Sequence, residues 1–222
     1  MRVVAIANQK GGPGKTTISL QMGIAAAGDG QRTLIIDLDP QGSGERWHAL
    51  RVKATRSHDD PSIVAGPVQK LTDMLKAAAR LGADLVIIDT PPKLDKAITE
   101  AAKVADIVLL PLRWGVLDGQ ALEDTVNLLK LANAHDKAAV VLNGLPCDDT
   151  RAAIVRECRS VARKLALPVL PAQLSQLPEY NTSLKKGRGV TETNQDGEAA
   201  SEIRALLAAA SGQGAKARRK AK

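Results

Sequence analysis

Aromatic residues are nearly absent from this chain of 222 residues: they make up 1% of it, and phenylalanine does not occur. The hydrophobic core must therefore be built from Ala, Val, Leu and Ile. Proteins that bind single-stranded nucleic acid stack its bases on aromatic side chains. The composition therefore disfavours that class of protein.

Cysteine and long hydrophobic runs are also scarce. Cys147 and Cys158 are the only cysteines. Neither has partners at metal-ligand spacing, so we expect both to be structural, and no metal site other than one for Mg²⁺. The apolar runs are far shorter than the roughly 20 residues of a membrane-spanning helix. The chain also opens on a strand pattern, without a charged and apolar leader. These absences predict a cytoplasmic protein.

The remaining composition, 44% hydrophobic and 25% charged, is ordinary for a soluble globular protein. The formal net charge is +7, and much of the excess lies in the segment 212–222, which contains no acidic residue. We therefore expect one domain over residues 1–211 and a disordered basic tail over 212–222. Such a tail attracts phosphate polyanions, or it serves only for solubility. Its basic residues are Lys216, Arg218, Arg219, Lys220 and Lys222.

Short apolar runs alternate with longer amphipathic stretches along the chain. This alternation predicts an α/β fold: a doubly wound, mostly parallel sheet with helices on both faces. The segment 51–67 interrupts the pattern, and we expect a mobile excursion or a short extra strand there. The predicted strands are Val3 to Asn8, Thr33 to Asp39, Leu85 to Thr90, Ile107 to Leu112, Ala139 to Asn143 and Val169 to Gln173. The predicted helices are Thr16 to Ala27, Val68 to Leu81, Lys96 to Val104, Gly119 to Ala134, Thr150 to Leu165 and Gly197 to Ala209.

A glycine-rich loop follows the first predicted strand and leads into the first predicted helix. Its glycines let backbone N–H groups close around an anion at the positive end of that helix. Lys15 would reach the terminal phosphates of a nucleotide, and the Thr16 hydroxyl suits Mg²⁺. The sequence therefore predicts a phosphate-binding loop whose nucleotide contacts come from Gly11, Gly12, Pro13, Gly14, Lys15, Thr16 and Thr17.

One position of this loop is unusual. Gln9 stands where the ordinary loop has glycine, and a second lysine, Lys10, follows it. Positive charge beside a transferring phosphoryl group stabilises the charge that develops there, as an arginine finger does. From the residues alone, Lys10 is either such a group, in its own or a partner subunit, or a solvated loop lysine.

Polar residues end three of the predicted strands. In a parallel sheet the ligand lies beyond the carboxyl ends of the strands. Asp89 follows four apolar residues, an arrangement that orients Mg²⁺ or its waters, although a strand-end Asp can also cap the next turn. Asp37 and Asp39 end another strand, and Asp39 is alternatively a turn cap. Asn143 offers the donor and acceptor that an adenine edge requires, or it is a turn residue before Gly144.

The sequence Lys-Gly-Gly-x-Gly-Lys-Thr-Thr resembles the deviant phosphate loop of the ParA/MinD superfamily of dimerising ATPases. The motifs Asp-x-Asp-Pro-Gln, Val-Ile-Ile-Asp-Thr-Pro-Pro and Leu-Leu-Pro-Leu extend the resemblance over most of the chain. The whole is similar to a short ParA-type partition ATPase. Because the loop begins by residue 10, we expect no N-terminal helix-turn-helix domain of the kind that larger members carry.

The resemblance implies roles for individual residues. Lys10 would act in trans on the nucleotide of a second subunit, and Asp39 would orient the attacking water. The implied catalytic residues are Lys10, Lys15 and Asp39. Mg²⁺ would be held by or near Thr16, Asp37 and Asp89. Asn143 and Pro171 would line the pocket for the base of ATP.

The resemblance also implies a cycle. ATP binding would close a homodimer that binds double-stranded DNA without sequence preference, and a ParB-like or cargo-adaptor protein would stimulate hydrolysis and release it. The protein would then be nucleoid-associated and would segregate a plasmid, a chromosome or a protein cluster.

Two basic sets are candidates for DNA contact, and each is alternatively a solvated surface. The first is Lys185, Lys186 and Arg188. The second is Arg156, Arg159 and Arg163, which lie close to one helical stripe. Related proteins often have arginines around residues 172–176, where this chain has none. We therefore give more weight to the first set and to the tail.

Two other classes of protein remain as alternatives. A MinD-like relative would bind membranes through a C-terminal amphipathic helix, but the segment beyond Gly212 has no bulky apolar residue to insert. An ATP-dependent synthetase of the same fold would keep the loop and the aspartates. An iron–sulfur reductase would need cysteines that Cys147 and Cys158 do not match.

Overall fold

The computed structural model describes residues 1–56 and 61–212 of the chain. These residues form a seven-stranded sheet in the order β3-β2-β4-β1-β5-β6-β7. All neighbouring strands run parallel, which confirms the predicted fold class. The strands are β1 (Arg2–Ile6), β2 (Thr33–Asp37), β3 (Ser62–Ala65), β4 (Leu85–Asp89), β5 (Ile107–Leu112), β6 (Ala138–Leu145) and β7 (Val169–Ser175).

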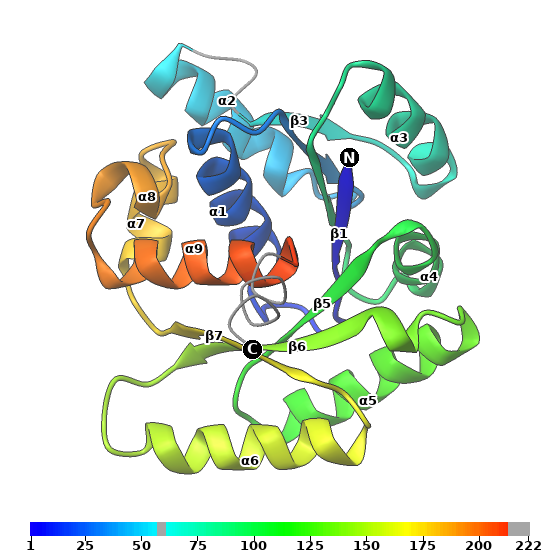
Figure 1. Cartoon of the computed structure of the whole chain (residues 1–222), viewed down its shortest axis with the longest axis vertical. Coiled ribbons are helices and arrows are strands. Elements are labelled where there is room, and N and C mark those ends of the chain that lie inside the picture. The colour runs from blue at the N-terminus through cyan, green and yellow to red at the C-terminus, as the bar shows by residue number, and fades with distance from the viewer. Residues whose placement is uncertain (57–60, 213–222) are drawn as a thin grey trace, which may run out of the picture.

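Helices cover both faces of the sheet. One face packs against α3, α4, α5 and α6, and the other against α1, α2, α7, α8 and α9. In Figure 1, α6 and α9 lie on opposite sides of β6 and β7. The helices are α1 (Lys15–Gly28), α2 (Ser43–Thr55), α3 (Leu71–Arg80), α4 (Asp95–Val104), α5 (Val116–Leu131), α6 (Arg151–Lys164), α7 (Glu179–Lys185), α8 (Val190–Thr193) and α9 (Glu198–Ala210). Two 3₁₀ turns, η1 (Val68–Lys70) and η2 (His135–Lys137), precede α3 and β6.

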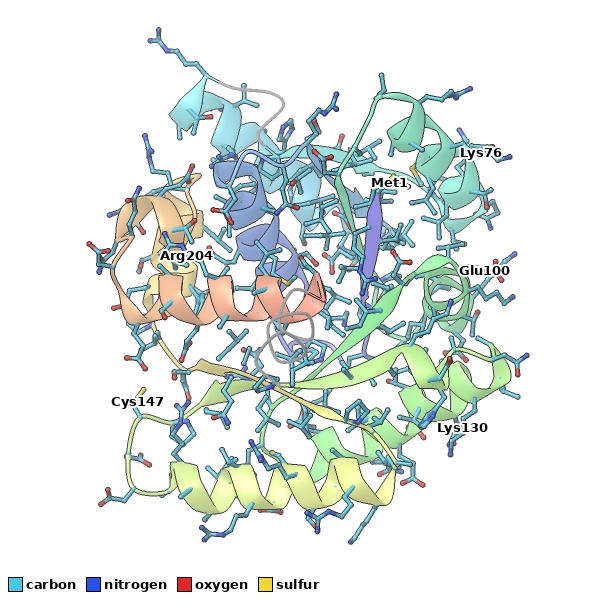
Figure 2. The ribbon with its side chains drawn as sticks, viewed as in Figure 1. Met1, Lys76, Glu100, Lys130, Cys147 and Arg204 are labelled. Carbon is cyan, nitrogen blue, oxygen red and sulfur yellow. The ribbon has the colours of Figure 1, made fainter. Side chains whose placement is uncertain are left out.

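Apart from Arg2 and Asp89 at their ends, the central strands β1, β4 and β5 are apolar, because both of their faces are covered. Val4, Ile87 and Leu109 are fully buried. Charged side chains such as Lys76, Glu100 and Lys130 instead lie on the outer helices α3, α4 and α5 (Figure 2). The two hydrophobic clusters, one on each face, consist mainly of Ala, Val, Leu and Ile, as the composition predicts.

The register of the sheet brings polar residues to one edge. Asp37 of β2 pairs with Asp89 of β4, and Asp89 pairs with Ile6 of β1. The phosphate loop follows β1 directly. The carboxyl ends of these three strands therefore surround the start of α1, as expected for a ligand site in a parallel sheet.

The structure corrects several predicted elements. Helices α2, α7 and α8 are not predicted, and the buried side chains of α2 include a charged one, Arg51, where an apolar residue would reveal helical periodicity. The short extra strand expected within 51–67 is confirmed as β3, but residues 51–55 belong to α2. The predicted helix over 68–81 begins with the turn η1. The predicted basic tail lies, beyond Gly212, outside the described residues.

None of the helices described here is both long enough and apolar enough to cross a membrane.

Candidate nucleotide site

The loop before α1 has the backbone of an anion-binding turn. Gly12 and Gly14 have φ angles of 86° and 95°, a region that favours glycine. A Cβ atom on Gly14 would lie 2.5 Å from Nδ2 of Asn143, so this position has no room for a side chain. The helix then starts at Lys15, with the N–H of Ile18 donating to the carbonyl of Gly14. Free N–H groups at such a start attract phosphate.

Lys15 lies beneath this loop. Its side chain is buried, and Nζ donates to the carbonyl oxygens of Asn8 at 3.0 Å and Lys10 at 2.9 Å. Burial lowers the pKa of Lys15, while the charges of Asp89 and Asp39 raise it. The lysine that was predicted to reach the phosphates is therefore tied to the loop and faces the two carboxylates.

Asp89 carries an unsatisfied oxygen. The residue is 1% exposed, and its Oδ1 has no hydrogen-bond partner among the described residues. Burial raises the pKa of Asp89 to about 7, although the Thr16 hydroxyl lowers it and the charge of Asp37 raises it further. A buried, unpartnered carboxylate oxygen beside a threonine hydroxyl fits Mg²⁺, which prefers oxygen ligands. Thr16 and Asp89 are therefore the residues that would hold the ion.

Asp37 is already engaged by backbone groups. Its Oδ1 accepts from the N–H of Asp39 at 2.9 Å, and its Oδ2 accepts from the N–H of Gly44 at 2.8 Å. Burial, the main cause, raises the pKa of Asp37. This carboxylate therefore fixes the turn that carries Asp39 and the first turn of α2. The sequence predicts a place near the metal but not this anchoring role.

Asp39 lies in the turn beyond β2. Its Oδ1 accepts from the N–H of Gln41 at 2.9 Å, which is the turn-capping arrangement left open by the sequence. The same residue also borders a cavity of about 280 Å³ with residues 11–17 of the phosphate loop, Thr90 and Pro92. Asp39 therefore both caps its own turn and borders the cavity at the phosphate loop.

Lys10 is ion-paired within its own subunit. Its Nζ lies 2.8 Å from Oδ1 of Asp118 on α5, and the two side chains are 35% and 9% exposed. The preceding residue is held by the same helix, because the N–H of Gln9 donates to Oγ1 of Thr125 at 3.0 Å. Asp118 and Thr125 lie two helical turns apart on one face of α5. The sequence predicts neither partner, since nothing in the local pattern of α5 points to the loop.

A second cavity, of about 220 Å³, adjoins the phosphate loop. Asn143 borders it, but its Nδ2 donates to the carbonyl of Pro13 at 2.6 Å, so this donor holds the loop. Pro171 does not border the cavity: it is exposed near the start of β7, whereas residues 174–177 after the strand's midpoint line the space. The contact of Pro171 with the base of ATP therefore stays a prediction, and this cavity lies at the other end of the strand. Other lining residues, which sequence reasoning missed, include Gln21, Arg113, Tyr180 and Asn181.

Comparison with known proteins agrees with this geometry. Residues 4–190 match the family described as "CobQ/CobB/MinD/ParA nucleotide binding domain". The chain belongs to this family. Over 211 residues, covering 92% of this chain and 94% of the relative, it is 32% identical to "Maintenance of carboxysome distribution protein A" of Halothiobacillus neapolitanus. It is 29% identical to "Chromosome partitioning protein ParA" of Myxococcus xanthus, covering 81% and 79% of the two chains.

A solved structure agrees with the fold. The MinD cell division protein of Aquifex aeolicus superposes with a TM-score of 0.72 at 18% identity, covering 93% of this chain and 95% of that one. Together these findings make the chain a ParA-type ATPase.

The two basic sets of this ParA-type chain lie on different faces of the sheet. Helix α6, which carries the exposed Arg156, Arg159 and Arg163, packs with α3, α4 and α5. Lys185, Lys186 and Arg188 are exposed at the end of α7, which packs on the opposite face with α1 and α2. The structure therefore does not bring the predicted DNA-contacting residues together into one surface of the subunit.

Proposed function

We propose that this ParA-type ATPase positions a cellular cargo by a nucleotide-dependent cycle. ATP with Mg²⁺ closes a homodimer that binds duplex DNA without sequence preference, and an adaptor protein that stimulates hydrolysis releases the DNA. The observation that carries this proposal is the placement of Lys10. This second loop lysine borders an open cavity of about 500 Å³, with Arg113 and Trp114 at its edge, where a second subunit can dock.

The chemistry assigned to the site follows from these positions. Phosphoryl transfer passes through a loose transition state, so catalysis rests on positioning and on charge. Bound Mg²⁺ supplies charge neutralisation at the phosphates. Lys15 stabilises the terminal phosphates from below the loop, and Asp39 aligns the water. Lys10 completes the positive charge by reaching the nucleotide of the other subunit, which requires it to leave Asp118.

DNA binding is assigned first to Lys185, Lys186 and Arg188 and second to the α6 set, with the segment 213–222 adding nonspecific attraction. All six side chains are exposed in the subunit. Each phosphate that a lysine or arginine neutralises adds about 0.9 to the slope of log affinity against log salt. A dimer using several cations per subunit would therefore lose DNA affinity steeply as salt rises.

The cargo is read by the adaptor and not by this fold. The relatives are named for carboxysome distribution and for chromosome partitioning. We propose that the cargo is a protein cluster, a chromosome or a plasmid. We also propose that the protein is cytoplasmic and associated with the nucleoid.

The test is binding of the purified chain to nonspecific duplex DNA with ATP, with ADP and without nucleotide, at several salt concentrations. We expect tight and salt-sensitive binding with ATP alone, and we expect Lys10→Ala to abolish the effect of ATP. Equal binding in all three states would contradict the proposed nucleotide-dependent cycle. It would mean that the basic residues attract DNA only through their charge, whatever the nucleotide. An absence of DNA binding, with flotation on anionic vesicles in ATP, would favour a MinD-like membrane role instead.

A further inference from the structure

The first basic set projects from a tight turn, residues 185–188, which we call the basic turn. Helix α7 ends at Lys185, and Gly187 closes the turn with a φ of 67°. The N–H of Gly187 donates to the carbonyl of Leu184, and the N–H of Arg188 to that of Ser183. This is a glycine-terminated helix end, which fixes the backbone that presents the three cations.

Helix α2 contacts the backbone of this turn directly. Nη1 of Arg51 donates to the carbonyl of Gly187 at 3.2 Å, and Nε1 of Trp47 donates to the carbonyl of Leu184 at 3.0 Å. A Cβ atom on Gly187 would lie 2.8 Å from the carbonyl oxygen of Leu50. The turn therefore rests against α2 at a distance that only glycine allows.

Arg51 also binds the segment that follows the turn. Its guanidinium makes two hydrogen bonds to the carboxylate of Glu192, at 2.9 and 3.0 Å, and lies 5.7 Å from the ring centre of Trp47. Glu192 in turn accepts from the N–H of Gly189 at 2.8 Å. Burial raises the pKa of Glu192, but the hydrogen bonds from Arg51 and Gly189 and the charges of Arg51 and Arg188 together leave this pKa below its usual value.

The burial of Arg51 is informative. The side chain is 1% exposed, and removing a guanidinium from water costs several kcal/mol unless a partner compensates for it. A well-packed apolar pair often stabilises a protein as well as a buried ion pair does. Stability alone therefore does not explain why a charge occupies this position. The charged pair does fix the end of the basic turn at Gly187 relative to the segment that follows it.

The opposite ends of the supporting helices face the nucleotide site. The first turn of α2 is anchored to Asp37 through the N–H of Gly44, next to the turn that carries Asp39. Helix α1, which starts in the phosphate loop, contributes the buried Gln21. This residue borders the 220 Å³ cavity, donates to the carbonyl of Tyr180 at 2.9 Å and accepts from the N–H of Val190 at 2.9 Å.

We propose that Arg51 is a positioning residue for DNA binding. Its ion pair with Glu192 fixes the basic turn against α2, so that the position of the turn depends on the state of the nucleotide site. The inference rests on the proposed function. In this arrangement α1 and α2 each join a nucleotide-contacting loop to the segment that carries Lys185, Lys186 and Arg188. The basic turn is then the part of the DNA surface whose placement depends on bound ATP.

The experiment compares the full chain with the double variant Arg51→Met/Glu192→Met. This variant keeps the net charge and replaces the ion pair with apolar side chains of similar length. Lys53→Met is the matched control, because it removes an exposed cation from the same helix. For each protein we would measure thermal unfolding, ATP affinity, and duplex DNA affinity with ATP and with ADP over a range of salt.

We expect the double variant to fold and to bind ATP like the unmodified chain. Its DNA affinity in ATP should fall by at least about tenfold, with a shallower salt slope. The slope should fall by about 0.9 for each phosphate that is no longer neutralised, or about 2.7 per subunit if all three cations disengage. Lys53→Met should lower the slope by no more than about 0.9 per subunit. These results together would support the proposed coupling between helix α2 and the basic turn.

Two results would overturn the inference. An unchanged salt slope and an unchanged ratio of ATP to ADP affinities in the folded double variant would make the pair purely structural. ATP-independent DNA binding by the unmodified chain would overturn the proposed function and this inference together. If the double variant does not fold, Glu192→Gln, which removes the charge but keeps the shape, provides the same readout, and an unchanged slope would again count against the proposal.

Discussion

The ion pair between Lys10 and Asp118 leads to a quantitative prediction about dimer formation. If Lys10 acts across a dimer, each subunit must first break this pair. Replacing Asp118 with Asn removes the charge that holds the lysine and keeps the size of the side chain. We therefore expect Asp118→Asn to strengthen ATP-dependent dimerisation.

The size of the effect follows from exposure. Lys10 is 35% exposed and Asp118 is 9% exposed, so the pair lies between a surface bridge and a buried one. A value of about 1 kcal/mol is reasonable for such a pair. Two pairs break in each dimer, which gives about 2 kcal/mol, or roughly a 30-fold lower dissociation constant. Added salt should reduce the gain, because it screens the partly exposed lysine.

Sedimentation equilibrium in ATP measures this constant directly, and an Asp39→Ala background keeps hydrolysis slow. Asp124→Asn is the matched control, because it removes an exposed carboxylate from the same helix α5. The reasoning would be refuted by an Asp118→Asn dimer as weak as the control or weaker. A weaker dimer would mean that Asp118 orients Lys10 for the closed state and does not withhold it.

Two further predictions concern the loop and the metal position. Gly14→Ala should cost about 1–3 kcal/mol of stability and abolish ATP binding, because φ is 95° and the new methyl group meets Asn143. Gly28→Ala, at the open end of the same helix, should instead be neutral or stabilise by up to about 1 kcal/mol. Unfolding and nucleotide titrations check both, and equal destabilisation of the two variants would be contrary evidence. In the nucleotide-free protein, Asp89 has a pKa of about 7 against 3.8 for the free side chain. The native state therefore holds a proton that the unfolded chain has released, and stability falls as pH rises from about 4 to about 7, by at most on the order of 4 kcal/mol. Asp89→Asn should remove this fall in denaturant titrations at pH 4 to 8; parallel curves for the two proteins would speak against it.

Much of the site can be predicted from the sequence because its residues belong to short, local patterns. The phosphate loop is continuous, and a strand-end carboxylate needs only the rule that ligands lie beyond the carboxyl ends of parallel strands. The observed register then places Asp37 opposite Asp89 without further information. The candidate Mg²⁺ position rests on a buried oxygen of Asp89, close to Thr16, that has no partner among the described residues.

The remaining features depend on partners that lie far apart in the sequence. Arg51 and Glu192 are 141 residues apart, and Lys10 and Asp118 are 108 apart. A buried arginine also hides the helix that carries it, because sequence reasoning searches for an apolar stripe. Pro171 shows a different limit: the local pattern predicts β7, but it does not show that residues at the other end of this strand border the cavity beside the phosphate loop.

The two basic sets lie on different faces of the sheet, and this separation indicates which set would bind DNA in an ATP-dependent way. Helix α6 packs on the face of the sheet that α3, α4 and α5 cover, away from α1 and α2. The basic turn instead rests on α2 through Arg51, and its segment is bonded to α1 through Gln21. Both of these helices begin at loops that contact the candidate nucleotide cavities. Under the proposed function, a change in the bound nucleotide would therefore reach Lys185, Lys186 and Arg188 through these contacts. If both sets bind DNA, the turn should account for the difference between ATP and ADP, and α6 for the binding that the two states share.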